Sequence, residues 1–213
     1  VSGVSFTLLW RGQHWANIAW AQPGIFNARN AAMAATASAL AVHPEDPTKL
    51  ALDALASFRG VKRRQEVLLN TPLLTVIEDF GHHPTALAET LRSFRARYLG
   101  ARLTAVFEPR SNTARTKAMQ AGFEEALALA DDVYLGAVNR PEKLKAEERF
   151  DPQHVVQNLQ VHGLHAQTAA SNAELLELLK RETLPLGPRR IVAFFSNGSF
   201  DGIVQKYVAA ASL

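Results

Sequence analysis

Two acids and two histidines stand together in the middle of the chain, in a pattern that suits a ligand site. The apolar run that begins at Leu73 ends in Glu78 and Asp79, a short loop with His82 and His83 follows, and a proline then opens a helical pattern. In an open α/β sheet, ligands bind beyond the carboxyl ends of strands, near helix N-termini. An acid at this place can bind a ribose hydroxyl pair, coordinate a metal or cap the next helix.

The two adjacent histidines raise the question of a metal. A metal site needs three or four ligands held by supporting neighbours, and neither HxxxH nor a carboxylate–histidine spacing occurs in this stretch. We therefore assign no metal ligand and expect a structural or substrate-orienting role for His83. A hydrolase that uses both histidines to hold a metal remains an alternative.

A second polar loop follows the apolar segment 103–107. It contains Arg110, Ser111, Asn112 and Thr113 just before a helical pattern. A guanidinium group and the free N–H groups of a helix start both favour a carboxylate or a phosphate. The alternative is an ordinary helix cap beside a solvated arginine. The residue types alone leave both interpretations open.

A third loop follows the last apolar segment of the chain. Ser196, Asn197, Gly198 and Ser199 precede Asp201 and another helical pattern. A glycine-containing turn with serines can hold an anion, although this signal is weak alone. We expect the three loops to share one edge of the sheet, which makes a site there more convincing than any single loop does.

Polar residues nearer the N-terminus have two readings each. Arg63 and Arg64 suit phosphate binding, or they lie on a solvated strand face. Asn27 and Asn30 stand near the start of a helical pattern, where they cap the helix or contact a base.

Short apolar segments alternate with amphipathic ones from about residue 70 onward. Leu87, Leu91 and Phe94 recur at helical spacing, which indicates a helix with one buried face. Such alternation predicts an α/β, Rossmann-like doubly wound domain with a mostly parallel sheet over residues 70–213. The expected strands are 73–79, 103–107, 133–137, 164–167 and 191–195, and the expected helices are 84–98, 113 to about 130 (with a break at Gly122 as an alternative), 152–161, 173–182 and 200–210.

Residues 1–69 predict a smaller α+β piece. We expect a hairpin of strands 4–10 and 14–20, an alanine-rich helix 27–42, a helix from Asp46-Pro47 to about 57, and a strand 61–69. The piece is small for a core of its own, which suggests the tail of a larger domain.

Composition limits the class of protein. The chain has 213 residues, a net charge of +3 and no cysteine. These values argue against a nucleic-acid-binding protein and exclude disulfides and thiolate chemistry. The sequence shows neither a membrane span nor a leader, and lacks GxxxxGK[ST], GxGxxG and GxSxG motifs. It begins at Val1 in mid-pattern, which suggests a fragment.

Five pieces together resemble the Mur ligases, the ATP-dependent peptide-forming enzymes of bacterial cell-wall synthesis. They are 24–31 (GIFNARNA), 58–64 (FRGVKRR), 78–85 (EDFGHHPT), 107–113 (FEPRSNT) and 196–201 (SNGSFD). The HHPT form resembles the members that act on UDP-N-acetylmuramate. The FEPRSNT loop resembles the murein peptide ligases, which join UDP-N-acetylmuramate to the tripeptide L-Ala-γ-D-Glu-meso-diaminopimelate in peptidoglycan recycling.

The resemblance implies a domain plan. Family members have a UDP-binding domain, a central ATPase domain and a C-terminal Rossmann-like domain. Residues 1–69 match the C-terminal remnant of the central domain, and residues 70–213 match the peptide-accepting domain. The implied cofactors are ATP and Mg²⁺, the implied partners are the two substrates and the missing domains of the same polypeptide, and the implied location is the bacterial cytoplasm.

The resemblance also implies roles for residues. Asn27 and Asn30 would contact adenine, Arg64 the ATP phosphates and Asp79 the ribose. Phe26 departs from the family, which usually has histidine there. The peptide substrate would be held by Arg110, Ser111, Asn112, Thr113, Ser196, Asn197 and Ser199, with His83 orienting nucleotide or substrate.

The implied reaction forms an acyl phosphate from the muramoyl carboxylate and ATP, which the peptide amine then attacks. The P-loop is absent, so we expect this chain alone to be inactive. Two alternatives stay open: a stand-alone Rossmann-like module that binds a peptide or nucleotide, and another Mur ligase such as the one that adds L-alanine.

Overall fold

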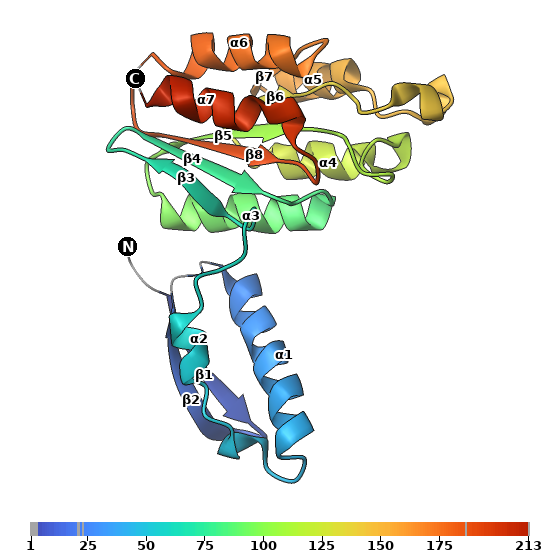
Figure 1. Cartoon of the computed structure of the whole chain (residues 1–213). Coiled ribbons are helices and arrows are strands. Elements are labelled where there is room, and N and C mark those ends of the chain that lie inside the picture. Colours follow the sequence, from blue (N-terminus) through green and yellow to red (C-terminus); the bar gives the residue numbers. More distant parts are fainter. Residues whose placement is uncertain (1–3, 21, 23, 186, 213) are drawn as a thin grey trace. The chain divides into compact units, whose positions relative to one another are not determined.

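The structure, a computed structural model, describes residues 4–20, 22, 24–185 and 187–212, and it consists of two compact units (Figure 1). Unit 1 is Val1–Val61 and unit 2 is Lys62–Leu213. The boundary between the units falls before the expected one at residues 69 and 70, because residues 66–70 form a strand that pairs with residues 75–78 of unit 2. Each unit is described by itself.

Unit 1 has a two-stranded antiparallel sheet and an alanine-rich helix. Strands β1 (Val4–Trp10) and β2 (Gln13–Trp20) form the expected hairpin, and α1 (Ile25–Val42) is the expected helix. The buried face of α1 consists of alanines, whose small side chains permit close packing. Two of them, Ala31 and Ala35, join a small core with Leu8, Ile18 and Trp20.

The expected helix from Asp46 to residue 57 is wrong. A 3₁₀ turn, Pro47–Lys49, is followed by an extended link and then by the short helix α2 (Asp53–Ser57). The carbonyl of Leu50 accepts a hydrogen bond from the Trp15 indole at 3.2 Å, so it is engaged outside any helix. The buried side chain of Leu52 fixes the link against the core of unit 1.

Unit 2 is a doubly wound α/β domain, as expected. Its described strands form a mixed six-stranded sheet in the order β3-β4-β8-β5-β6-β7, in which the pairs from β4 to β7 are parallel and β3 is an antiparallel edge. The strands are β3 (Glu66–Asn70), β4 (Leu74–Asp79), β5 (Arg102–Phe107), β6 (Asp132–Leu135), β7 (His165–Thr168) and β8 (Arg190–Phe195). The helices are α3 (Pro84–Arg97), α4 (Gln120–Leu127), α5 (Pro152–Val161), α6 (Asn172–Thr183) and α7 (Ile203–Ala211).

Helices cover both faces of this sheet (Figure 1). Alternate residues of a strand point to opposite faces, so β8 sends Ala193 and Phe195 into one core and Phe194 into the other. The first core includes residues of α3, α4 and α5, and the second includes residues of α6 and α7. The sheet is therefore rigidly held, and its strand ends present loops in fixed positions.

Two local expectations in unit 2 are wrong. Residues 61–65 are not a strand, because Arg63 and Gln65 adopt left-handed backbone conformations (φ 60° and 52°). Their N–H groups are bound by the carboxylates of Glu66 (2.7 Å) and Asp79 (2.9 Å). These contacts hold the residues before Glu66 in turns, so β3 begins at Glu66.

The expected helix 113–130 begins late. Residues 112–115 form turns, a 3₁₀ turn covers Lys117–Met119, and α4 begins at Gln120. Ser111 Oγ accepts a hydrogen bond from Ala114 N at 2.9 Å, and such side-chain contacts to the backbone compete with helix formation. Gly122 lies inside α4 and does not break it.

Candidate functional site at the carboxyl edge of the sheet

The three polar loops meet at one edge of the sheet, because β4, β8 and β5 are neighbours. Asp79, Phe195 and Phe107 stand side by side at the ends of these strands. Ser196 N donates to the Asp79 carbonyl at 3.2 Å, and Glu108 N donates to the Phe195 carbonyl at 3.1 Å. The backbone thus carries the parallel pairing one step beyond the strands, which fixes the first residue of each loop.

A buried carboxylate organises this edge. Glu108 is 2% exposed and directly follows β5. Ser196 Oγ donates a hydrogen bond to Glu108 Oε2. Asn172 Nδ2 donates to Glu108 Oε1 at 3.1 Å, and Arg110 Nη1 lies 3.4 Å from the same oxygen. Asn172 Nδ2 also donates to Asp201 Oδ2 at 2.8 Å, so α6 and the loop before α7 join the cluster.

Arg110 lies across Gly198. A Cβ atom built on Gly198 would come within 2.0 Å of the Cδ and Nε atoms of Arg110, so no other residue fits there without moving the arginine. The arginine side chain is 29% exposed, and the contact with Glu108 engages one of its five N–H donors. Its position therefore combines a fixed stem with a guanidinium group that reaches solvent.

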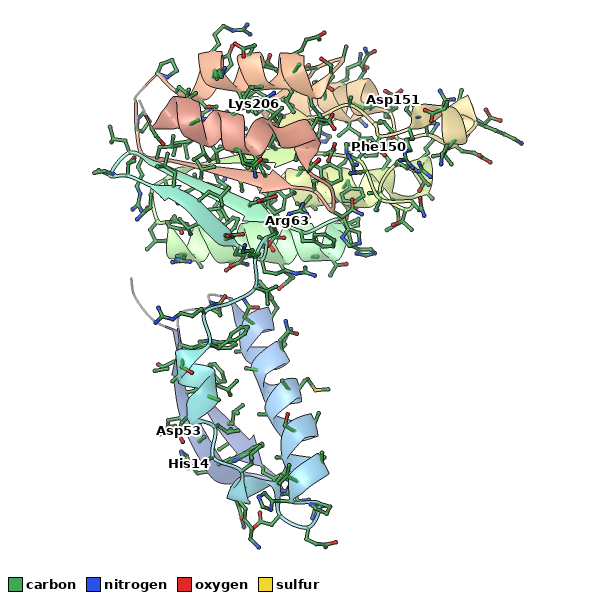
Figure 2. All side chains as sticks on the ribbon, viewed as in Figure 1. His14, Asp53, Arg63, Phe150, Asp151 and Lys206 are labelled. Atoms are coloured by element: carbon green, nitrogen blue, oxygen red, sulfur yellow. The ribbon has the colours of Figure 1, made fainter. Side chains whose placement is uncertain are left out.

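Arg63 holds the same turn from the other side. Its Nε donates to Glu78 Oε1 at 2.7 Å, and its Nη2 donates to the carbonyls of Ser196 (2.7 Å) and Gly198. Figure 2 labels Arg63 on the ribbon of unit 2. Arg64 differs from Arg63 because it is exposed, and its guanidinium lies 5.1 Å from the centre of the Phe80 ring. Arg63 is thus the structural arginine of the pair.

Asp79 anchors the loop that precedes β3. It is 5% exposed, and its two carboxylate oxygens accept hydrogen bonds from Gln65 N (2.9 Å) and Gly81 N (2.7 Å). Burial raises the pKa of Asp79 above its ordinary value, against the lowering effect of these two hydrogen bonds and of the nearby arginines. The amide atoms of Gln65 are buried beside it, with no hydrogen-bond partner in the described part of the chain.

The loop after β5 forms a self-contained turn. Ser111 Oγ lies 3.2 Å from Thr113 Oγ1, and Asn112 Oδ1 accepts a hydrogen bond from Arg115 Nη2 at 2.9 Å. Asn112 and Thr113 are exposed next to Arg110 in the chain. Part of the expected capping role is therefore present, and the turn still presents polar side chains to solvent.

The remaining predicted residues have varied surroundings. Ser196 is 2% exposed and its hydroxyl also accepts from Gly198 N at 2.8 Å, so it lies inside the cluster. Asn197 Oδ1 is buried, with no partner among the residues that the structure describes, and Ser199 is exposed. His83 caps α3 by accepting from Thr85 N at 3.3 Å.

Two predicted residues belong to unit 1. Asn27 is partly buried and Asn30 is exposed, both in the first turns of α1. The N-cap residue of this helix is Gly24, which has no side chain to cap it.

Sequence reasoning missed Glu108 and Asn172 as members of the cluster, and it considered Arg63 only as a phosphate-binding or solvated residue. Glu108 had the same signal as Glu78 and Asp79, an acid directly after an apolar strand. Arg63 and Asn172 gave no such signal, because their partners lie far away in the chain.

Among the described residues, no group of three or more histidine, cysteine, aspartate or glutamate side chains is placed to hold a metal ion. Within the same residues, no helix is long and apolar enough to cross a membrane.

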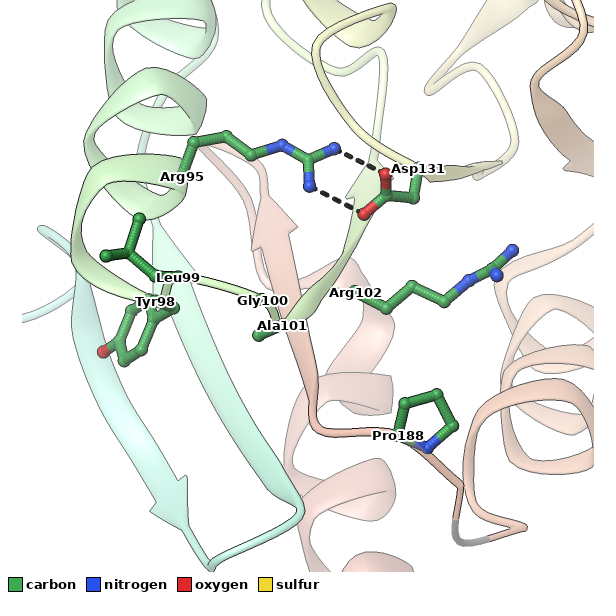
Figure 3. A pocket seen from close by; sticks show the side chains of 8 residues that line it. All are labelled: Arg95, Tyr98, Leu99, Gly100, Ala101, Arg102, Asp131 and Pro188. Carbon is green, nitrogen blue, oxygen red and sulfur yellow. Dashed lines mark hydrogen bonds and ion pairs between the residues drawn. The ribbon is translucent and has the colours of Figure 1, made fainter.

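The opposite edge of the sheet carries a pocket of about 560 Å³ (Figure 3). It is lined by Arg95, Tyr98, Leu99, Gly100, Ala101, Arg102, Asp131 and Pro188. Arg95 binds both carboxylate oxygens of Asp131, at 2.7 and 2.8 Å, and Arg102 likewise binds Asp132 at 2.6 and 2.7 Å. These charges are therefore paired within unit 2.

Residues 63–198 match the sequence model of the Mur ligase glutamate ligase domain, and that match covers more than half of the chain. The chain therefore belongs to the Mur ligase family, with unit 2 as its Rossmann-like C-terminal domain.

Relatives with two different ligase activities are similar to this chain. The chain is 36% identical, over 94% of its length, to a UDP-N-acetylmuramate–L-alanyl-γ-D-glutamyl-meso-2,6-diaminoheptandioate ligase from Haemophilus influenzae, and spans 41% of that protein. A murein peptide ligase from Psychrobacter arcticus has a similar structure, with a TM-score of 0.68 at 27% identity over 92% of this chain and 39% of that one. A UDP-N-acetylmuramate–L-alanine ligase from Bifidobacterium longum subsp. infantis is 38% identical over 57% of this chain and 23% of its own length.

Proposed function

We propose that this chain is the peptide-accepting part of an ATP-dependent ligase that joins UDP-N-acetylmuramate to L-Ala-γ-D-Glu-meso-diaminopimelate. The observation that carries the proposal is Arg110, whose guanidinium is held at the carboxyl edge beside an exposed polar turn. The activity of the Haemophilus relative, which is similar over nearly the whole chain, supplies the substrate class.

The carboxyl edge divides the proposed work between two groups of residues. Arg110 pairs with a substrate carboxylate, since a guanidinium fork matches that group. Ser111, Asn112, Thr113 and Ser199 offer hydroxyl and amide groups around it. Ser196 and Asn197 support the site from inside the buried cluster, because the Ser196 hydroxyl is already hydrogen-bonded to Glu108 and Gly198. His83 orients substrate or nucleotide while capping α3.

Nucleotide binding is proposed for Asn27, Asn30, Arg64 and Asp79. Arg64 supports this role because it is exposed and carries an unburied charge. Asp79 is mostly enclosed, so its contact with a ribose requires one carboxylate oxygen to accept a ribose hydroxyl in addition to its backbone donor. An oxygen with two lone pairs permits this.

The proposal includes domains beyond unit 1. Helix α1 carries Arg29 as the one charged residue of its sequence, and it exposes 73% of Met33 and 62% of Val42. An 18-residue helix with this exposed apolar surface and a sheet of two described strands form an incomplete layer. We infer that further strands of a central ATPase domain pack on unit 1 in the full polypeptide.

The proposed reaction follows the family chemistry. The γ-phosphoryl group of ATP is transferred to the muramoyl carboxylate, which gives an acyl phosphate and ADP. The peptide amine then attacks the acyl carbon, loses a proton and releases phosphate as the amide forms. Mg²⁺ and phosphate-binding groups supply charge stabilisation when bound, and we assign none of the Mg²⁺ ligands to this chain. Its own residues hold the peptide carboxylate and orient the amine. A bacterial cytoplasmic location is part of this proposal.

Calorimetry tests the peptide site directly. The 213-residue chain should bind the tripeptide, and Arg110→Ala should bind it at least tenfold more weakly, because a charged hydrogen-bonded pair contributes roughly 1.5–3 kcal/mol. Arg92→Ala is the matched control, since Arg92 is exposed on α3 and pairs with Glu89. Equal affinities of Arg110→Ala and the wild type would remove Arg110 from this role. The chain alone should form no amide bond, and ligation by the purified chain would contradict that expectation.

The L-alanine-adding activity is the second candidate, supported by the Bifidobacterium relative. The same calorimetry separates the two, because free L-alanine and the tripeptide both carry an amine and a carboxylate but differ in length. Tight binding of L-alanine with none of the tripeptide would favour the second candidate. A stand-alone binding module is tested by the coding sequence upstream of Val1, where a GK[ST] loop favours the ligase.

A further inference from the structure

A buried acid that the proposed reaction does not use stands at the centre of the carboxyl edge. Glu108 is 2% exposed, and it receives hydrogen bonds from a hydroxyl, an amide and a guanidinium that belong to Ser196, Asn172 and Arg110. Burying a carboxylate is costly unless its oxygens are satisfied. Here each of its two oxygens has a donor, so the group is stable where it lies and holds its three partners in place.

Of the three partners of Glu108, Arg110 is the one that contacts solvent, whereas Ser196 and Asn172 are buried. Arg110 follows two residues later, and its stem lies on Gly198, whose turn is closed by Ser196 Oγ. Glu108 therefore contacts both sides of the Arg110–Gly198 packing. Without its charge, the guanidinium would have no acid to hold it among the contacts that the structure describes, and the arginine side chain has several competing rotamers.

We propose that Glu108 is the positioning residue of this site: it fixes the Arg110 guanidinium across Gly198 and so presents the remaining N–H donors to a substrate carboxylate. This inference rests on the proposed function for the identity of the bound group. The positioning itself does not depend on the substrate, so it can be measured in the free chain.

Glu108→Gln isolates the charge from the packing. Glutamine has the same shape, its amide N–H can donate to Ser196 Oγ, and its oxygen can still accept from Asn172. The fold should therefore persist, while the charge-assisted contact with Arg110 is lost. Asp132→Asn is the matched control: Asp132 is likewise a buried acid (1% exposed) bound by arginines, but it lies at the start of β6, at the opposite edge.

The first measurement needs no ligand. The Nη–Hη resonances of Arg110, assigned by their loss in Arg110→Lys, should show slow rotation about the Cζ–Nη bonds in the wild type and in Asp132→Asn, and faster rotation in Glu108→Gln, because Glu108 binds Nη1. Unchanged rotation in Glu108→Gln would overturn the proposal.

The second measurement is tripeptide affinity in a double-mutant cycle. Glu108→Gln should weaken binding roughly tenfold, and Glu108→Gln with Arg110→Ala should bind no more weakly than Arg110→Ala alone, because Glu108 acts through Arg110. Asp132→Asn should lose stability but keep affinity. If the double variant lost affinity by the product of the two single-variant losses, the proposal would be overturned. If the wild type binds no tripeptide, the proposed peptide site fails, while the resonance still decides the role of Glu108.

Discussion

Replacing Asp132 with asparagine should destabilise unit 2 strongly, whereas the same change at the neighbouring Asp131 should not. Asp132 is 1% exposed, and its carboxylate binds Arg102 at 2.6 and 2.7 Å and Arg190 at 2.6 Å. His165 lies 3.3 Å from the same group. An asparagine at this position leaves two guanidinium groups around a neutral amide.

The size of the stability loss in Asp132→Asn depends on how exposed the arginine partners of Asp132 are. Removing one member of a buried ion pair costs roughly 3–5 kcal/mol. The Arg102 side chain is 45% exposed and that of Arg190 is 18% exposed, so water compensates part of the loss and about 3 kcal/mol is expected. Asp131 and Arg95 are 37% and 39% exposed, and such pairs contribute at most about 1 kcal/mol.

The chain offers a built-in way to read the two units separately. Its three tryptophans, Trp10, Trp15 and Trp20, lie in unit 1, and its three tyrosines lie in unit 2. In urea unfolding, Asp132→Asn should shift the tyrosine near-ultraviolet transition and leave tryptophan fluorescence unchanged. Asp131→Asn should shift neither by much.

Unfolding at acid pH can refute this account of Asp132. Burial raises the pKa of Asp132, but the hydrogen bond from Arg102 and the charges of Arg190 and Arg102 lower it further, and the net pKa lies below the ordinary 3.8. A carboxyl group with a depressed folded pKa contributes stability that is present above the unfolded value and is lost as pH falls through the folded one. The gap between wild type and Asp132→Asn should therefore shrink as pH falls below the ordinary pKa of 3.8 and through the depressed folded pKa. Equal losses at Asp131 and Asp132, or a gap that persists in acid, would refute the reasoning.

Three further predictions concern single changes. Gly198→Ala should weaken tripeptide binding as much as Arg110→Ala does, because the new methyl group occupies the space of the arginine stem; calorimetry measures it, and wild-type affinity would contradict the packing. Arg63→Ala should lower the free energy of unfolding by about 2 kcal/mol, since it frees Glu78 and two carbonyls, whereas Arg64→Ala should change it by less than about 0.5 kcal/mol in the same urea titration. Burial and the charge of Asp132 raise the pKa of Tyr134 well above the ordinary 10.0. A group with a raised folded pKa lowers the stability of the fold as pH rises through its unfolded pKa. Tyr134→Phe should therefore reduce the loss of stability above about pH 10, as measured by circular dichroism.

The sequence predicted elements well where local signals agreed. Helix α5 has the expected bounds, 152–161, because Asp151 caps it and Pro152 suits its first turn. Strands β4, β5 and β8 follow from short apolar runs. The starts of β3 and α4 were missed, since side chains that bind the backbone decide them: Asp79 at Gln65, and Ser111 at Ala114.

The candidate site was predictable in outline and not in detail. Parallel strand order alone brings the loops after β4, β5 and β8 to one edge, which places Arg110 near Ser196. The roles of Arg63 and Asn172 depend on partners 133 and 64 residues away in the chain, Ser196 and Glu108 respectively. Residue type and spacing carry no information on such contacts.

The order of the strands has a consequence for synthesis of the protein. β8, the last strand in the chain, lies between β4 and β5 at the centre of the sheet. A ribosome that has released everything before residue 190 has made two separate half-sheets, β3-β4 and β5-β6-β7, each with an open hydrogen-bonding edge. Unit 2 should therefore complete its fold only after its final residues emerge, and a premature stop before β8 should yield an aggregation-prone chain rather than a trimmed domain.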